Sequence, residues 1–215
     1  MPEDTTKPKR SNNGDSTRKR IVIAARRSFF ANGFRGVSMD DLARELGMSK
    51  RTLYEHFSSK TALVEAAILN KFKDIDAELE QITSAPSEFP DTLHRLLACI
   101  QQHTGEIQPP FIRDIRRQPG IFHHVERGRI DLVQRYLGKL LSRGRKSGVV
   151  REDVSAALII EIILGALERI MNPQKMAELD ITPKAGYSAI IAVVLEGVIT
   201  EEGKSLYCGR VKSEE

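Results

Sequence analysis

Two short helical patterns separated by a glycine constrain this chain more than any other feature of its sequence. Ser38 is followed three residues later by Asp41, the reciprocal capping pair that starts a helix. Gly47 then ends that helix, because glycine readily adopts the backbone conformation needed after a last helical turn. Ser49 caps a second helix that reaches Phe57. Two short helices joined by a glycine-containing turn form a helix-turn-helix, which we expect over residues 38–57.

The second of these helices has one apolar face and one polar face. Leu53 and Phe57 are expected to face inward, which leaves the polar side chains outward. Long cationic donors near the N-terminus of such a helix can reach base edges in the major groove of DNA. We therefore predict that Lys50 and Arg51 contact bases and that Thr52 touches a thymine methyl group.

Other polar side chains around this motif are predicted to contact phosphates, which fixes the register without reading sequence. They include Arg18 and its two basic neighbours at the start of the first helix. The alternative is that Ser38 and Ser49 act only as helix caps and that Tyr54 is a packing residue. The predicted DNA-contacting residues are Ser38, Ser49, Lys50, Arg51, Thr52, Tyr54, His56, Lys60 and Arg18.

The charge of the chain is unevenly distributed. Residues 1–60 hold 13 Lys and Arg against 7 Asp and Glu, whereas the remainder is slightly acidic and the whole chain carries a net charge of +4. A basic N-terminal segment on a mildly acidic body predicts that the N-terminal end meets a polyanion. The alternative is a solvated charged face.

The rest of the chain shows helical periodicity, with no apolar and polar alternation of the kind found in strands. We therefore expect an all-α protein of about nine helices, with an N-terminal three-helix helix-turn-helix domain and a C-terminal helical domain. The expected helices cover residues 16–32, 38–46, 49–57, 58–84, 92–107, 111–118, 121–147, 153–171 and 184–202.

The stretch from Ala25 to Leu63 resembles the TetR family of bacterial transcription regulators. The spacing of Tyr54, Phe57 and Lys60 is among the most specific features of that resemblance. A weaker likeness lies in residues 148–153, where the family links into its dimerisation helices. The resemblance implies a homodimer that binds double-stranded DNA at a palindromic operator. It also implies an effector/dimerisation domain in which a small-molecule effector, unknown here, relieves repression.

We expect four parts along the chain. A disordered arm covers residues 1–15, the helix-turn-helix DNA-binding domain residues 16–60, the ligand-binding and dimerisation domain residues 61–202, and a flexible tail residues 203–215. The arm is polar and has few apolar side chains that could repay the entropy of ordering it.

The last two expected helices, residues 153–171 and 184–202, are apolar around most of their circumference, so each must be covered on more than one side. We predict that they meet their copies in a two-fold interface of four helices. The alternative is that they form the centre of a monomeric bundle. Glu161 and Glu168 are predicted to pair across the interface, with a cationic ligand as the alternative.

Candidate effector contacts lie around a Pro-Pro break in the body: Ile107, Phe111, Arg113 and Phe122. An anionic or amphiphilic effector could use Arg113 with these apolar side chains, although a solvent-exposed basic face is equally consistent. The competing hypothesis is a DNA-bound adaptor or architectural protein whose C-terminal domain binds a protein partner. An enclosed apolar cavity would favour the ligand-responsive repressor, and a filled core with an exposed apolar patch the adaptor.

Several other classes are disfavoured. Neither a catalytic triad order nor a phosphate-binding glycine loop stands out, so we expect neither an enzyme nor a cofactor. The His-x-x-Glu spacings that start at His103 and His123 recur on ordinary helix surfaces, so no metal site is predicted. The most apolar stretch, residues 156–167, is shorter than the ~20 residues needed to cross a bilayer, so no membrane partner is expected. Cys99 and Cys208 are expected to be free thiols in a cytoplasmic protein.

Overall fold

The computed structural model describes residues 11–201 and 203–204. Within these ranges the structure has eleven numbered α-helices and one π-helical turn, with one isolated antiparallel bridge between Val150 and Ile199. Residues 201 and 203–204 are also helical. The chain is therefore all-α, as expected. The elements are α1 (Ser11–Asn32), α2 (Met39–Leu46), α3 (Lys50–His56), α4 (Lys60–Ser84), α5 (Phe89–Gly105), α6 (Pro109–Arg116), α7 (Pro119–Leu132), η1 (Val133–Leu137), α8 (Gly138–Lys146), α9 (Ala156–Ile170), α10 (Pro173–Glu178) and α11 (Pro183–Val198).

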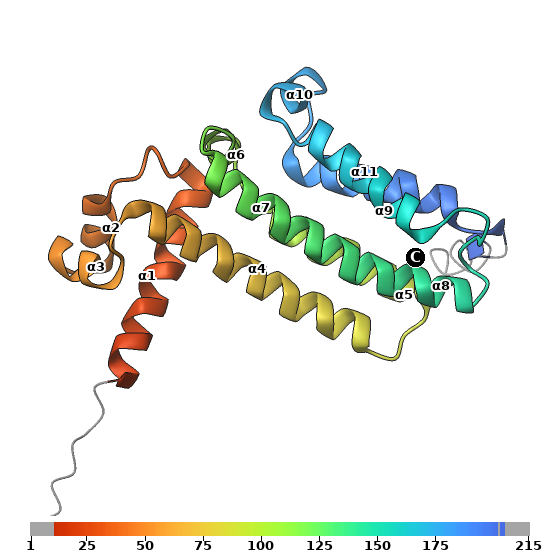
Figure 1. The fold of residues 1–215 in the computed structure, drawn as a ribbon, viewed down its shortest axis with the longest axis horizontal. Helices are drawn as coiled ribbons and strands as arrows, with labels where there is room; N and C mark the ends of the chain where they lie inside the picture. The colour runs from red at the N-terminus through yellow and green to blue at the C-terminus, as the bar shows by residue number, and fades with distance from the viewer. Residues whose placement is uncertain (1–10, 202, 205–215) are drawn as a thin grey trace, which may run out of the picture.

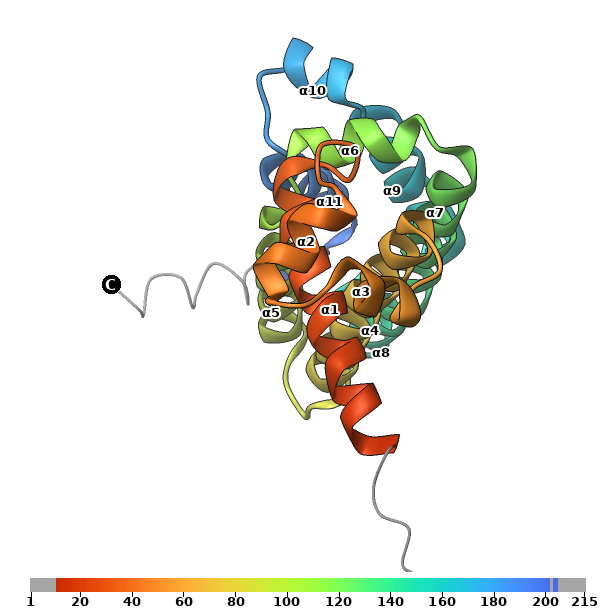
Figure 2. The same cartoon turned by 90° about the vertical axis from the view of Figure 1, so that its left-hand side faces the viewer.

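The first three helices form an N-terminal head at one end of the molecule (Figure 1). Its centre is made by fully buried side chains from all three helices, namely Ile21 and Phe29 of α1, Leu42 of α2 and Leu53 of α3. Seen from its outer side in Figure 2, the head places α2 and α3 beside α1 and in front of the body. The inward positions predicted for α3 are therefore confirmed.

A pair of side-chain contacts attaches α2 to α1. Arg27 forms an ion pair with Glu45, and the Ser28 hydroxyl donates a hydrogen bond of 2.9 Å to the same carboxylate. These two donors hold the pKa of Glu45 below its usual range. Both the buried apolar contacts and these polar contacts therefore hold the helix-turn-helix against α1.

The body is built along α4, which runs away from the head along the body (Figure 1). Helices α5, α7, α8, α9 and α11 pack with α4 around a second hydrophobic core. That core includes Leu93 of α5, Leu140 of α8, Ile163 of α9 and Leu195 of α11. Two cores joined by one long helix agree with a small head attached to a larger helical domain.

Several helix boundaries differ from those expected. Helix α1 begins at Ser11, so residues 11–15 of the predicted arm are helical; the rest of that arm lies outside the described residues, as do residue 202 and most of the predicted tail. The last helix ends at Val198, because Ile199 takes an extended conformation and pairs with Val150. Helix α10 was not predicted; Asn172 caps it and Pro173 occupies its first turn.

The helix expected over residues 121–147 is continuous but contains the π-helical turn η1. A π turn adds a residue to one helical turn and so changes which side chains face inward. Here it accompanies a fully buried Tyr136, whose hydroxyl donates to Asp76 Oδ1 at 2.6 Å. The π-helical turn was not predicted, because helical periodicity in the sequence does not distinguish a π turn from an α turn.

Helix α6 contacts the C-terminal end of α1 and connects it to the body. Asp114 is buried and its Oδ2 accepts a hydrogen bond of 2.7 Å from the backbone N–H of Arg35. The Phe111 ring lies 4.4 Å from the ring of Phe30, centre to centre. The chain can turn here because Gly33 has a φ of +76°, in the left-handed region that favours glycine.

Replacing Gly33 by alanine should lower the free energy of unfolding by about 2–4 kcal/mol, because two costs combine. The new Cβ would carry the left-handed strain, and it would lie only 2.6 Å from Asp114 Oδ2. Gly47→Ala is the matched control, because Gly47 has a φ of +66° but no atom within 4 Å of such a Cβ. It should cost about 1–2 kcal/mol. Urea unfolding followed by circular dichroism measures both values, and equal losses would contradict the role given to Asp114.

Candidate nucleic-acid interface and effector cavity

The helix-turn-helix is held by local hydrogen bonds that its sequence specifies. Ser38 accepts from the backbone N–H of Asp41 at 3.1 Å, and the Asp41 carboxylate accepts from the Ser38 N–H at 3.1 Å, which completes the predicted capping box. Gly47 ends α2 in the left-handed conformation. Ser49 then caps α3 by accepting from the N–H of Thr52 at 3.0 Å. These caps set the angle at which α3 leaves the turn.

The two predicted base-contacting residues lie in the first turn of α3 and face solvent. The Arg51 side chain is 90% exposed, and its Nε lies 3.1 Å from Glu55 Oε1 on the next turn. Lys50 Nζ lies 3.0 Å from Asp40 Oδ2 of α2, and this hydrogen bond raises the pKa of Lys50. Exposed ion pairs of this kind contribute little free energy, so an incoming polyanion can displace them.

The remaining predicted contacts lie around α3, but not all in the same manner. Tyr54 is exposed, whereas His56 is half-buried. Lys60 is half-buried too, and burial lowers its pKa. The Arg18 guanidinium lies 4.5 Å above the ring of Phe57, which places α1 beside the C-terminal end of α3. The Thr52 hydroxyl lies 2.9 Å from that of Ser49, so the predicted reader of a thymine methyl also belongs to the cap.

One cationic side chain of the head was missed by the sequence analysis. Arg44 of α2 is strongly exposed and makes only a long contact of 3.5 Å with Asp41. Its signal was present in the sequence, since it lies opposite the apolar stripe formed by Leu42 and Ala43. It adds an exposed cation to α2, on which Asp40 and Asp41 are exposed carboxylates.

The body contains an apolar cavity of about 190 Å³. It is lined by residues of α1, α4, α5, α6, α7, η1, α9 and α11, together with the segment that precedes α6. Of the four predicted effector contacts, Ile107 and Phe111 line this cavity, whereas Arg113 and Phe122 do not. Arg113 is turned to solvent because Phe111 and Ile115 occupy the inner face of α6. Phe122 instead lies under the guanidinium of Arg116, 5.4 Å from its centre.

The cavity wall also contains polar side chains that were not predicted from the sequence. Lys71 of α4 is buried, with Nζ 2.7 Å from Glu106 Oε2, and burial lowers the pKa of its ammonium group. Lys71 follows Ile68 by three residues and precedes Ile75 by four, so a cation in an apolar stripe was its signal. His103 of α5 and Arg129 of α7 line the same cavity.

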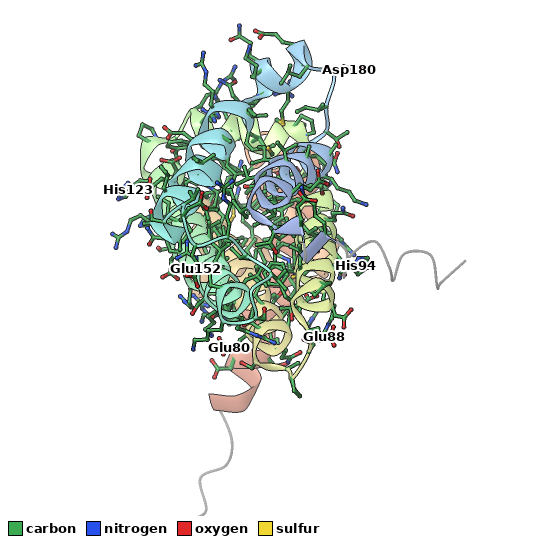
Figure 3. The ribbon with its side chains drawn as sticks, turned by 90° about the vertical axis from the view of Figure 1, so that its right-hand side faces the viewer. Glu80, Glu88, His94, His123, Glu152 and Asp180 are labelled. Carbon is green, nitrogen blue, oxygen red and sulfur yellow. The ribbon has the colours of Figure 1, made fainter. Side chains whose placement is uncertain are left out.

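His103 takes part in a cluster that the histidine spacings did not predict. Its Nε2 lies 2.8 Å from Glu78 Oε2, and Cys99 lies one turn before it on α5. Burial, together with Glu78, raises the pKa of the Cys99 thiol to about 12, so the thiol stays protonated at neutral pH. His123, by contrast, lies at the outer edge of the molecule (Figure 3). We interpret the cluster as a hydrogen-bonded contact between α4 and α5; Cys208 lies outside the described residues.

A capped two-helix motif with an exposed, cationic second helix defines a helix-turn-helix DNA-binding protein. Residues 21–67 match the family described as "Bacterial regulatory proteins, tetR family". Residues 21–67 therefore carry the N-terminal domain of the TetR family of transcriptional regulators. The relatives and structural neighbours that the chain resembles are named as regulators of transcription.

Relatives resemble the chain over most of its length at low identity. The transcriptional regulator UidR of Escherichia coli K12 is 22% identical over 186 residues, which cover 86% of this chain and 93% of UidR. The transcriptional activator FasR of Mycolicibacterium smegmatis is 32% identical over 87 residues, which cover 40% of this chain and 38% of FasR.

Solved structures share the fold. A TetR-family regulator from Agrobacterium tumefaciens has a TM-score of 0.68 at 18% identity, over 87% of this chain and all (100%) of that one. A TetR regulator from Chloroflexus aurantiacus has a TM-score of 0.63 at 21% identity, over 87% and 98% of the two chains. As for membranes, none of the helices described is both long and apolar enough to span one.

Proposed function

We propose that the protein is a ligand-responsive repressor, which binds a two-fold-symmetric operator as a homodimer and leaves it when a small molecule fills the cavity. The observation that carries this proposal is the composition of the cavity wall. It includes Phe30 of α1 and Phe111 of α6, the two rings at the junction of head and body. A molecule bound in the body would therefore touch the contact that orients the head.

The assignment of DNA contacts follows from exposure and position. Lys50 and Arg51 would reach base edges from the first turn of α3, with Thr52 beside them. Tyr54, His56, Lys60, Arg18 and the caps Ser38 and Ser49 would contact phosphates and fix the register. A planar guanidinium can donate to both acceptors of a guanine, so Arg51 would carry most of the sequence preference.

The dimer interface is proposed on α9 and α11, which lie side by side at the surface of the body (Figures 1 and 3). Leu158 and Ile162 are 53% and 48% exposed on one face of α9, and Val193 is 71% exposed on α11. Apolar side chains in adjacent helical stripes form the kind of patch that a second subunit covers. Glu161 and Glu168 are exposed on α9, where they could pair across such an interface.

Helix α6 would transmit binding from the cavity to the head. It is attached to the head through the N–H of Gln108, which donates to the Phe30 carbonyl at 3.0 Å. It is attached to the body through Arg116, which donates to the Met171 carbonyl at 3.1 Å. Two heads must sit about 34–36 Å apart to enter successive major grooves, so a small shift of each head abolishes the fit. A coupling of about 1–3 kcal/mol suffices.

Both signs of regulation occur among similar proteins. FasR is named as an activator, and a protein of similar fold at 18% identity is described as SmeT, the repressor of a multidrug efflux pump. An adaptor that binds only a protein partner would not need the apolar cavity, which therefore favours an effector of small size.

The proposal is tested with a DNA fragment selected by the protein and labelled for fluorescence anisotropy. A screen of small molecules should find one that releases the DNA, and Ile100→Phe should weaken that release because it fills part of the cavity. DNA binding without effector should not change. If every releasing compound acts equally on the filled variant, the cavity is not the effector site.

Replacing Asp40 by asparagine should raise DNA affinity by about 2- to 5-fold at low salt, because it frees Lys50 and removes a negative charge from the DNA-facing surface. The gain should shrink at high salt, where exposed charges are screened. Asp180→Asn removes the same charge from an exposed site near α10 (Figure 3) and serves as the control. An equal effect of both variants in an anisotropy titration would contradict the placement of Lys50.

A further inference from the structure

The cavity wall contains most of the buried side-chain nitrogen atoms of the described chain whose hydrogen bonding is incomplete. Four buried side-chain nitrogen atoms in the described residues lack a well-oriented hydrogen-bond partner: Lys71 Nζ, His103 Nδ1, Arg129 Nε and Arg145 Nε. Three of them belong to residues that line the cavity, from α4, α5 and α7. Buried polar groups are nearly always hydrogen-bonded in folded proteins, so a cluster of exceptions requires an explanation.

The carboxylates near these nitrogens lie on the outer side. The Lys71 side chain is 5% exposed, whereas that of its partner Glu106 is 40% exposed. Glu126, which accepts from Arg129 Nη2 at 3.0 Å, is also more exposed than its partner. Glu78 accepts from His103 Nε2, so that Nδ1 of the neutral ring is an acceptor without a partner. The donors are thus buried, and the protein leaves part of their hydrogen-bonding capacity unused.

The rest of the wall is apolar. Phe72 and Ile75 of α4, Ile100 of α5, Leu132 of α7 and Val133 of η1 are typical of its surface. A cavity of about 190 Å³ is somewhat larger than the roughly 150 Å³ that holds a benzene molecule. It therefore fits a compact apolar body of the size of a substituted ring or a medium-length alkyl chain.

We propose that the effector is an apolar monocarboxylate, whose carboxylate accepts hydrogen bonds from Arg129 and Lys71 while its apolar part fills the cavity. This inference rests on the proposed function, since it names the chemical class of that effector. A carboxylate offers acceptors only, and it matches the N–H groups of Lys71 and Arg129 at two of the unsatisfied positions. A cationic ligand would be repelled by Lys71 and Arg129, and an alcohol would leave donors unpaired.

Calorimetric titration of the full-length protein tests the ligand class without DNA. Octanoate, octan-1-ol and octylammonium differ only in their head group, and 4-phenylbutyrate with 4-phenylbutan-1-ol repeats the comparison on a ring. We expect each carboxylate to bind about 10- to 100-fold more tightly than its alcohol, and octylammonium to bind weakest. Equal affinities of acid and alcohol, or no binding by either acid, would overturn the proposal.

A pair of variants on α7 tests the residue assignment. Arg129→Met should weaken octanoate binding about 10- to 100-fold and leave octan-1-ol within about 2-fold. Arg127→Met removes an exposed cation from the same helix and should change neither. A similar loss for acid and alcohol would show that Arg129 only supports packing, against the proposal. If Arg129→Met does not fold, the affinities of the unmodified protein for the acid and the alcohol still test the proposed ligand class.

Release of DNA separates this inference from the function on which it rests. A carboxylate that binds in the cavity and releases the labelled operator supports both. Release only by compounds without a carboxylate would overturn the ligand class and leave the repressor mechanism standing. Tight carboxylate binding without release would overturn the effector role that we assign to it.

Discussion

Arg51→Ala should lower the preference for the operator over a version with one altered guanine by about 1–3 kcal/mol in each half-site, or about 5- to 150-fold. The side chain lies in the first turn of α3 and is almost fully exposed, so its removal changes the DNA interface without disturbing the core. Competition between the two duplexes, followed by fluorescence anisotropy, gives the discrimination directly.

Two further variants distinguish sequence discrimination from nonspecific electrostatic binding to DNA. Lys60→Ala should weaken binding to the operator and to random DNA alike, and reduce the slope of log K against log salt by about 0.9 for each phosphate that the protein no longer neutralises. Glu55→Ala removes the partner of Arg51 and should leave discrimination intact, which excludes loss of that ion pair as the cause. If the alanine variants of Arg51 and Lys60 behaved identically, the division into base-reading and phosphate-binding residues would be wrong.

Introducing charge on the proposed dimer face should lower operator affinity at least about 100-fold. The double variant Ile162→Glu and Val193→Glu places carboxylates on both exposed apolar stripes, so two copies would meet with like charges and unpaired polar groups. A monomer then binds with one head and loses the gain from linking two. Light scattering should report a monomer at micromolar concentration, and anisotropy the weaker binding.

The control for this variant is Leu69→Glu, which alters an equally exposed apolar residue on α4, away from α9 and α11. It should leave both mass and operator affinity unchanged. A protein that is already monomeric before mutation would refute the interface, as would a double variant that remains a dimer with full affinity.

The head was predictable because its signals are local. The capping box of Ser38 and Asp41, the left-handed Gly47 and the cap Ser49 each act within four residues, so their geometry follows from short sequence patterns. The burial of Leu53 and the exposure of Arg51 follow from helical periodicity. The order and type of most body helices were predictable for the same reason.

The effector site was only half predictable, because it depends on packing between helices distant in sequence. Phe111 was recognised, but Arg113 could be turned to solvent or to the cavity until the packing of α6 was known. Lys71 and Glu106 meet across a long sequence separation, and no local pattern pairs them. The start of α1 at Ser11 was missed since a polar segment carries no apolar period.

The central claim is that α3 of two linked heads reads a defined DNA sequence. Selection from a library of random duplexes, with the full-length protein at near-physiological salt, tests it most directly. We expect enrichment of one inverted repeat, with half-site centres separated by one turn of about 10–10.5 base pairs or by a multiple of it. Recovery of DNA with no enriched sequence, or of a single unrepeated half-site, would contradict the account.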